Sequence, residues 1–137
     1  MQKIKINNCL FTAKVVDDPE SVALGMMGKT FDKTFNAMLF VLNKTEPEPE
    51  PYSSNHYIEL SSMNEKENQC FWMKNCIIPL DMIFIKKGRI TKIHHLCPPC
   101  NTKTCKNYCG IGTMVLEVNG GTCKTMNITE GNFVDFV

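Results

Sequence analysis

The sequence predicts a mainly β protein with a minor helical component, namely a compact antiparallel β-sandwich or barrel-like domain with two short helices. Apolar segments of strand length recur along the 137 residues, and turn-forming residues separate most of them. Helix signals, in contrast, are confined to two short segments. Many short strands with few helices are typical of compact sandwiches and barrels. The length suits a single domain spanning 1–137.

The N-terminal part of the chain is predicted to contain strands followed by a short helix. Residues 3–16 interleave apolar and polar side chains in the manner of strands. Asp18 can cap a helix and Pro19 suits its first turn, so a helix is expected from there to about Met27. The apolar run 37–42 has the length and composition of a buried strand.

Residues 43–69 differ from the rest in composition and are predicted to form a Glu/Pro-rich insertion loop. Glutamate alternates with proline over 46–51, and proline both removes backbone donors and favours extended polyproline geometry. Such a stretch is unsuited to the interior of a sheet. We therefore expect a solvated loop with a short edge strand at 57–60, and not a second domain.

The second half of the chain is predicted to be rich in strands. Residues 71–75 have strand character, and the segment 71–85 is expected to lie at the centre of the fold. Residues 81–85 and 90–96 flank Gly88 in the pattern of a hairpin. The later pattern predicts a cysteine-rich loop at 97–112, a strand at 114–118, a helix at 122–126 and a terminal strand at 133–137.

Composition and charge argue against several classes of protein. The net charge is +1 and no Lys/Arg stripe is present, so nucleic-acid binding is not expected. No apolar run approaches the roughly 18 to 20 residues that span a bilayer, which argues against a membrane protein. The first residues lack the apolar core of a signal peptide. We therefore expect a cytoplasmic protein or, for a viral source, a virion protein.

Several short motifs occur in a defined order along the chain. They are Leu-Gly-Met-Met at 24–27, Met-Leu-Phe-Val at 38–41, Phe-Trp-Met-Lys-Asn at 71–75, the run 79–85, and Val-Leu-Glu-Val-Asn at 115–119. This order resembles the family called domain of unknown function 192. The resemblance implies a small β-sandwich or barrel-like fold with minor helices, and it implies no established activity.

A group of polar side chains surrounds the single tryptophan in the sequence. Trp72, Lys74 and Asn75 lie shortly before Asp81, and Glu117 lies in a later strand. These groups could orient a small polar ligand or act as acid and base. The alternative is a buried ion-pair network with Asn75 bonded to the backbone of a turn. The two interpretations differ in whether the lysine and the two carboxylates converge on open space or on one another.

Four cysteines in the predicted loop have the spacing C-x2-C-x4-C-x3-C. Cys97, Cys100, Cys105 and Cys109 could together bind one structural zinc ion, which thiolates hold in tetrahedral geometry. The family resemblance instead implies a disulfide between Cys100 and Cys105, around which Cys97 and Cys109 could form a second bridge. Either arrangement would staple the loop, and no other cofactor is expected. The remaining cysteines, Cys9, Cys70, Cys76 and Cys123, are expected to be free core residues.

The sequence contains no complete catalytic constellation, so we expect a non-catalytic β module that binds a protein partner or assembles into a larger structure. Eight cysteines in a chain without an export signal suggest one concrete version, an accessory or capsid-associated protein of a virus or phage. The alternative is a small-polar-ligand binding protein or enzyme that uses Lys74, Asp81 and Glu117 under Trp72.

Overall fold

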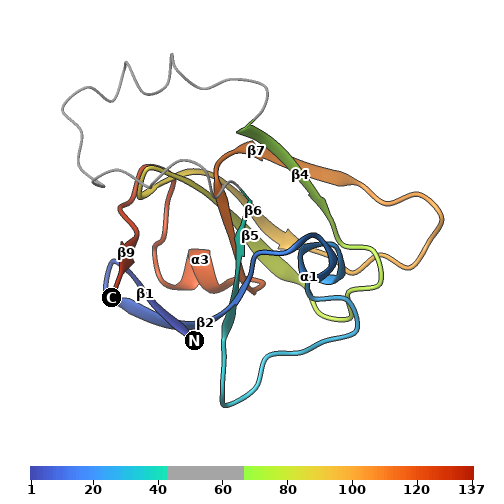
Figure 1. Ribbon diagram of the computed structural model, residues 1–137, viewed down its shortest axis with the longest axis horizontal. Helices are drawn as coiled ribbons and strands as arrows, with labels where there is room; N and C mark the ends of the chain where they lie inside the picture. The colour runs from blue at the N-terminus through green and yellow to red at the C-terminus, as the bar shows by residue number, and fades with distance from the viewer. Residues whose placement is uncertain (43–66) are drawn as a thin grey trace.

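The computed structural model describes residues 1–42 and 67–137, which form a large curled sheet and a small second sheet. The large sheet has seven strands in the order β6-β5-β8-β3-β2-β1-β9, and the small sheet pairs β4 with β7 (Figure 1). The strands are β1 (Gln2–Ile6), β2 (Cys9–Val16), β3 (Ala37–Val41), β4 (Asn68–Trp72), β5 (Leu80–Lys86), β6 (Arg89–Cys97), β7 (Asn107–Ile111), β8 (Met114–Asn119) and β9 (Asp135–Phe136). The predicted mainly β, barrel-like fold is confirmed.

Strand pairing follows the turn signals in the sequence. In the β5–β6 hairpin, Lys87 and Gly88 both have positive φ values, 53° and 70°, as a tight two-residue turn requires. Every described strand pair is antiparallel except β2 with β3, which run parallel and are joined through a helix. The edges of the large sheet also approach each other, because Ile90 exchanges backbone hydrogen bonds of 3.0 and 2.7 Å with Asn132 and Gly131.

Two hydrophobic cores occupy the two faces of the large sheet. Side chains alternate along a strand, so Ile83 and Ile85 of β5 face the inner core while Met82 and Phe84 face the outer core. All seven residues of β5 are buried, which explains why this strand is an apolar run. The small sheet and the first helix cover the outer core (Figure 1).

Two short helices complete the described structure. Helix α1 (Pro19–Leu24) begins as predicted, since a carboxylate oxygen of Asp18 accepts a 2.8 Å hydrogen bond from the backbone N–H of Ser21. Helix α3 (Thr122–Thr125) places Cys123 in the inner core. Within the described residues, no helix is long and apolar enough to cross a membrane.

The structure corrects three features predicted from the sequence. Strand β4 begins at Asn68, so the predicted insertion loop 43–69 overlaps a strand. Residues 43–66 of that loop, with the predicted edge strand at 57–60, lie outside the described residues. Strand β7 lies inside the predicted cysteine-rich loop 97–112. Because β4 and β7 pair only with each other, the start of the segment 71–85 belongs to the peripheral sheet and not to the centre of the fold.

Candidate functional site

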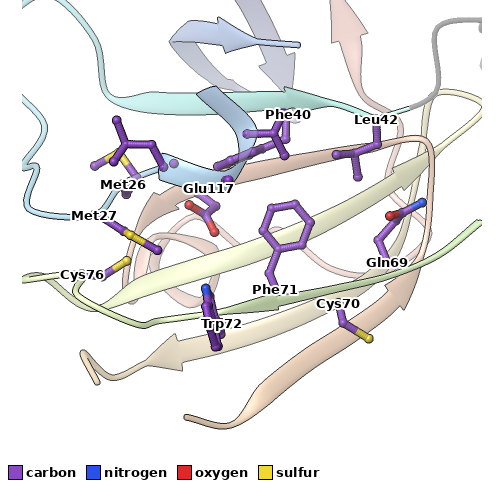
Figure 2. Close-up of a pocket in the computed structure, with 14 residues that line it drawn as sticks. Met26, Met27, Phe40, Leu42, Gln69, Cys70, Phe71, Trp72, Cys76 and Glu117 are labelled. Atoms are coloured by element: carbon purple, nitrogen blue, oxygen red, sulfur yellow. The ribbon is translucent and has the colours of Figure 1, made fainter. Parts of the chain in front are cut away.

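A pocket of about 220 Å³ lies between the large sheet, helix α1 and strand β4 (Figure 2). Its lining is mostly apolar and includes Met26, Met27, Phe40 and Phe71. Glu117 contributes the one acidic side chain among the described lining residues. The pocket therefore combines an apolar wall with a single carboxyl group, which is the usual composition of a small-molecule site.

The turn after helix α1 shapes one side of this pocket. Gly25 has φ +47°, a conformation that side-chain-bearing residues rarely adopt. A Cβ atom at Gly25 would lie 3.2 Å from the ring of Phe40, so the backbone packs directly against that ring. Lys29 holds the turn from outside by donating a 3.0 Å hydrogen bond to the carbonyl of Gly25.

Aromatic rings form the opposite wall and the mouth of the pocket. Phe71 packs edge-to-face against Phe40 and Phe84, with ring centroids 4.9 and 6.0 Å apart. At the mouth, Trp72 is 45% exposed and Leu24 is 49% exposed. The interior wall is thus rigidly packed, while the entrance presents apolar side chains to solvent.

Glu117 lies at the base of the pocket on strand β8, opposite Met38 of β3 and Met82 of β5. Its carboxyl group points into the space bounded by Met27, Phe71 and Trp72 (Figure 2). The residue is only 3% exposed, and no described residue forms a hydrogen bond or ion pair with its carboxyl group. Burial raises the pKa of Glu117 to about 8, so this carboxyl is mostly neutral at pH 7.

Asp81 does not share this pocket, contrary to the predicted ligand-binding cluster. Its carboxylate accepts hydrogen bonds from the backbone N–H groups of Leu96 at 2.8 Å, Gly121 at 3.0 Å and Cys123 at 2.9 Å. The alternation along β5 places Asp81 on the inner face with Ile83, whereas Glu117 is on the outer face. Asp81 therefore joins the end of strand β6 to the turn before helix α3 and to the start of that helix.

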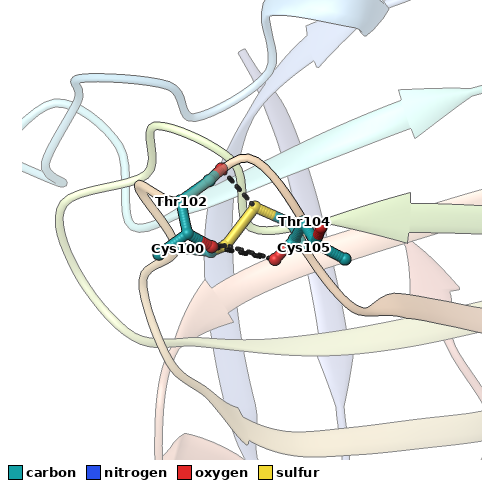
Figure 3. Close-up of a disulfide and its surroundings, with 4 residues drawn as sticks. All are labelled: Cys100, Thr102, Thr104 and Cys105. Carbon is teal, nitrogen blue, oxygen red and sulfur yellow. Dashed lines mark hydrogen bonds between the residues drawn. A yellow bond between two sulfur atoms is a disulfide. The ribbon is translucent and has the colours of Figure 1, made fainter.

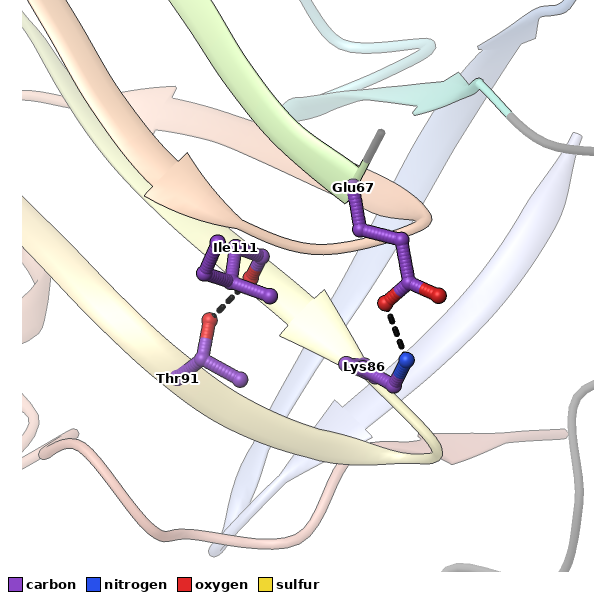
Figure 4. A network of polar contacts seen from close by, with 4 residues as sticks. All are labelled: Glu67, Lys86, Thr91 and Ile111. Atoms are coloured by element: carbon purple, nitrogen blue, oxygen red, sulfur yellow. Dashed lines mark hydrogen bonds and ion pairs between the residues drawn. The ribbon is translucent and has the colours of Figure 1, made fainter. Parts of the chain in front are cut away.

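Another buried acid, Glu67, forms an ion pair with Lys86 at the far end of strand β5 (Figure 4). The two residues are each 6% exposed. Nearby, the Thr91 hydroxyl donates a hydrogen bond to the carbonyl of Ile111. These contacts join the small sheet to the large sheet and leave Glu67 with a partner, unlike Glu117.

Lys74 and Asn75 lie beside the pocket and do not line it. The ammonium group of Lys74 is 5.5 Å from the centroid of the Trp72 ring, within the range of a cation–π contact. Asn75 has φ 59°, and its backbone bonds to Cys100 and to Gly28, each at 2.8 Å. Asn75 is therefore a turn residue that ties two loops together. Of the predicted cluster, only Trp72 and Glu117 line the pocket.

The cysteines form two disulfides in the described chain. Cys100 bonds to Cys105, the pair that the family resemblance implied (Figure 3). The predicted Cys97–Cys109 bridge is wrong, because Cys109 bonds to Cys70, its direct partner in the β4–β7 register. Cys97 instead ends β6 as a buried free thiol. Since three of the four proposed zinc ligands are committed to disulfides, that ligand set does not form.

The free cysteines of the described chain are buried, as expected for three of them, whereas Cys70 was wrongly predicted to be free. Cys76 lines the pocket, and burial raises its pKa to about 11, with the charge of Glu117 adding to the effect. Burial also raises the pKa of Cys97 to about 12. Both thiols are therefore protonated at neutral pH and are poor nucleophiles. No group of three or more His, Cys, Asp or Glu among the described residues could hold a metal ion.

Several pocket residues were not recognised as functional candidates in the sequence. The sequence places Met26 and Met27 in a predicted helix and Phe40 and Phe71 in predicted strands, and apolar side chains give no signal that separates a pocket wall from a packed core. One signal was available. The Leu-Gly-Met-Met motif at 24–27 lies entirely along the pocket, so a family motif rich in apolar residues indicated its position.

Two crystal structures have the same fold. A proposed transcription regulator from Sinorhizobium meliloti 1021 superimposes with a TM-score of 0.70 and 22% identity, covering 98% of this chain and 92% of that one. A protein of unknown function from Novosphingobium aromaticivorans DSM 12444 superimposes with a TM-score of 0.69 and 22% identity, covering 97% and 83%. At this level of identity the likeness concerns the fold alone.

Sequence comparison identifies the family. No curated protein matches the chain. The sequence model of the DUF192 family, described as an uncharacterized ACR, matches residues 58–136, which is more than half of the chain. The matched region contains Phe71, Trp72 and Glu117 of the pocket. The chain belongs to the DUF192 family.

Proposed function

We propose that this protein is a non-catalytic binding domain, and that the pocket above Glu117 is its small-molecule site. One observation carries the proposal: a carboxyl that is 3% exposed has no hydrogen-bond partner among the described residues and points into the pocket. Buried polar groups nearly always have partners, because each unpaired one destabilises the fold by about 1–3 kcal/mol. A ligand would supply the missing partner.

The chemistry of the lining favours binding over catalysis. Burial raises the pKa of Cys76, a thiol that lines the pocket, to about 11, and no positive charge among the described residues lowers this pKa as the activation of a thiol requires. Asp81, the other acid of the predicted cluster, is committed to backbone donors on the opposite face of the sheet. Glu117 is thus a single titratable carboxyl without a second group placed to act with it in the described pocket.

A fragment screen with a blocked variant would test the proposal. Trp72 is the only tryptophan and lies at the pocket mouth, so its fluorescence should change when a fragment binds. Ala23 lines the pocket, and Ala23→Phe should weaken binding about tenfold or more, equivalent to at least about 1.4 kcal/mol. Glu20→Phe adds the same ring to the same helix outside the lining and should leave binding unchanged.

The screen would count against the proposal in two ways. In the first, no fragment of any charge class binds the wild-type protein. In the second, Ala23→Phe and Glu20→Phe bind fragments equally well. Thermal unfolding of both variants would establish that each is folded before binding is compared.

We further propose that assembly with a protein partner is a separate role of the same face. Leu24 and Trp72 expose apolar surface at the pocket mouth, which is a common property of interaction sites. The specific version, an accessory protein of a virus or phage particle, requires the protein to be present in purified particles. Its absence from them would remove that version and leave the small-molecule site unaffected.

A further inference from the structure

We propose that the ligand of the pocket is a small organic ammonium ion with one positive charge, bound by an ion pair to Glu117. This inference rests on the proposed function and specifies its ligand class. It follows from three properties of the described pocket: an unpartnered acid at the base, a wall of rings and thioethers, and a small volume.

The other buried acids indicate what Glu117 lacks. Asp81 has three backbone donors, and Glu67 has the ammonium group of Lys86. A partner for Glu117 would have to come from outside the described residues. An ammonium ion satisfies the carboxylate by charge and by hydrogen bonds together, and such charge-assisted bonds are about twice as strong as neutral ones.

The pocket wall is suited to a cation with an apolar body. Phe40, Phe71 and Trp72 contribute rings whose faces attract positive charge, and Met26 and Met27 contribute polarizable thioethers. No lysine or arginine is among the described lining residues, so nothing in the wall competes for the carboxylate. Neutral hydrogen-bonding ligands would use only part of this environment.

Size and surrounding charge restrict the ligand further. The volume of about 220 Å³ is below the roughly 300–1,000 Å³ of drug-sized sites, so the ligand carries about one ring or a short chain. Lys74 holds its ammonium group 5.5 Å from the Trp72 ring at the mouth. A second positive charge on the ligand would be repelled there, which favours monoamines over diamines.

Binding of such a ligand should be coupled to proton release. Burial raises the pKa of Glu117 to about 8, so at pH 7 the empty pocket mostly holds the protonated carboxyl. An ammonium ion pairs with the ionised form, and the proton therefore leaves when the ligand enters. The affinity for an amine should rise as the pH increases from 6 to 8, while the affinity for a neutral ligand of the same shape should not.

Benzylamine and benzyl alcohol form a matched pair of probes for calorimetry. At pH 7 we expect benzylamine to bind about tenfold more tightly than benzyl alcohol. Titrations in phosphate and in Tris, whose ionisation enthalpies differ, should show release of most of one proton per benzylamine bound. Glu117→Gln should remove the proton release and weaken benzylamine about tenfold or more, with benzyl alcohol changed less than about threefold.

Asp135→Asn is the matched control, because it removes a carboxylate at an exposed position of β9 outside the pocket lining. It should leave both affinities unchanged. Equal affinity for the two probes, or equal loss of both in Glu117→Gln, would overturn the ammonium ligand and leave the binding pocket in place. Binding of neutral fragments without binding of benzylamine would also overturn the ammonium ligand and leave the binding pocket in place. If no probe or fragment binds at all, the proposed function itself fails.

Discussion

Asp81 and Glu117 are buried acids on neighbouring strands, yet their surroundings differ in kind. Asp81 on β5 is fully buried and accepts three backbone N–H hydrogen bonds on the inner face of the sheet. Glu117 on β8 is 3% exposed, has no partner among the described residues, and faces a pocket on the outer side. Burial alone therefore does not separate the structural carboxylate of Asp81 from the carboxyl of Glu117, for which we propose a binding role; the presence of a partner does.

The difference also reflects what each residue contributes to folding. The carboxylate of Asp81 joins β6 to the turn before α3, so its hydrogen bonds connect parts of the chain 15 to 42 residues away. Glu117 makes no such connection and requires desolvation of its carboxyl group. Residues in binding sites often lower the stability of the fold, and a buried, unpaired carboxyl in a pocket is such a residue.

Replacing Asp81 with alanine should have the largest effect on the free energy of unfolding among the substitutions that test this comparison. Three backbone donors would lose their acceptor at once; the hydrogen bond of Cys123 is buried, and those of Leu96 and Gly121 are partly buried. An unpaired donor shielded from water costs about 1–3 kcal/mol. We expect the free energy of unfolding to fall by about 5 kcal/mol in a urea titration at pH 7. Glu117→Ala in the same titration should lose less than half as much, because no donor loses a partner.

Equal losses in the two variants would contradict the distinction between Asp81 and Glu117. If Asp81→Ala fails to fold while Glu117→Ala folds, the distinction is supported, because the loss of stability in Asp81→Ala then exceeds the stability of the protein.

Glu117→Gln should stabilise the protein at neutral pH. Burial raises the pKa of Glu117 from its ordinary 4.5 to about 8. Below pH 4.5 the carboxyl is protonated in the folded and unfolded chains alike. Between pH 4.5 and about 8 only the unfolded chain ionises it, so the wild type loses stability relative to the variant as the pH rises. The advantage of Glu117→Gln should reach about 3 kcal/mol at pH 7 and level off above pH 8.

Urea titrations of both proteins from pH 4 to 9 would measure this advantage. A constant difference across the range would show that Glu117 ionises normally in the folded protein. Asp135→Asn is again the control, and its difference from the wild type should stay small throughout.

Gly25→Ala should have the smallest of the three effects and should act on the pocket. The φ of +47° and the 3.2 Å approach to the Phe40 ring should reduce the free energy of unfolding by about 2 kcal/mol. The shifted ring should also weaken benzylamine binding severalfold. Gly28→Ala is the control, because Gly28 has φ +67° but open space around its Cβ position; it should lose about 1 kcal/mol and bind normally. Equal binding by both variants would exclude Gly25 from shaping the site.

Local signals predicted much of the fold. The Asp18 cap, the turn at Gly88 and the apolar strand at 37–42 depend on residues close together in sequence, and all three appear in the structure. The disulfide Cys100–Cys105, which joins residues five positions apart, was implied by the family resemblance and not by the spacing of the cysteines. Cys70–Cys109 was missed because it depends on the pairing of β4 with β7, residues 39 positions apart.

The candidate site was predicted in part. Trp72 and Glu117 were selected from the sequence, and both line the pocket. Asp81 was grouped with them, although alternation along its own strand places it with Ile83 on the inner face. The error arose because alternation relates residues within one strand, whereas the register between β5 and β8 decides which faces coincide.

The amino-acid sequence alone was enough for the mainly β fold, the helix start, the hairpin turn and the family, since these follow from local conformational preferences and from an ordered set of motifs. The partners of the buried acids depended on the assembled fold. Whether a carboxylate meets three backbone N–H groups, as Asp81 does, or an open pocket, as Glu117 does, is settled by strand register and by the packing of distant segments. Those contacts join residues far apart in sequence, so they form only when the whole chain folds and the register between the strands is fixed.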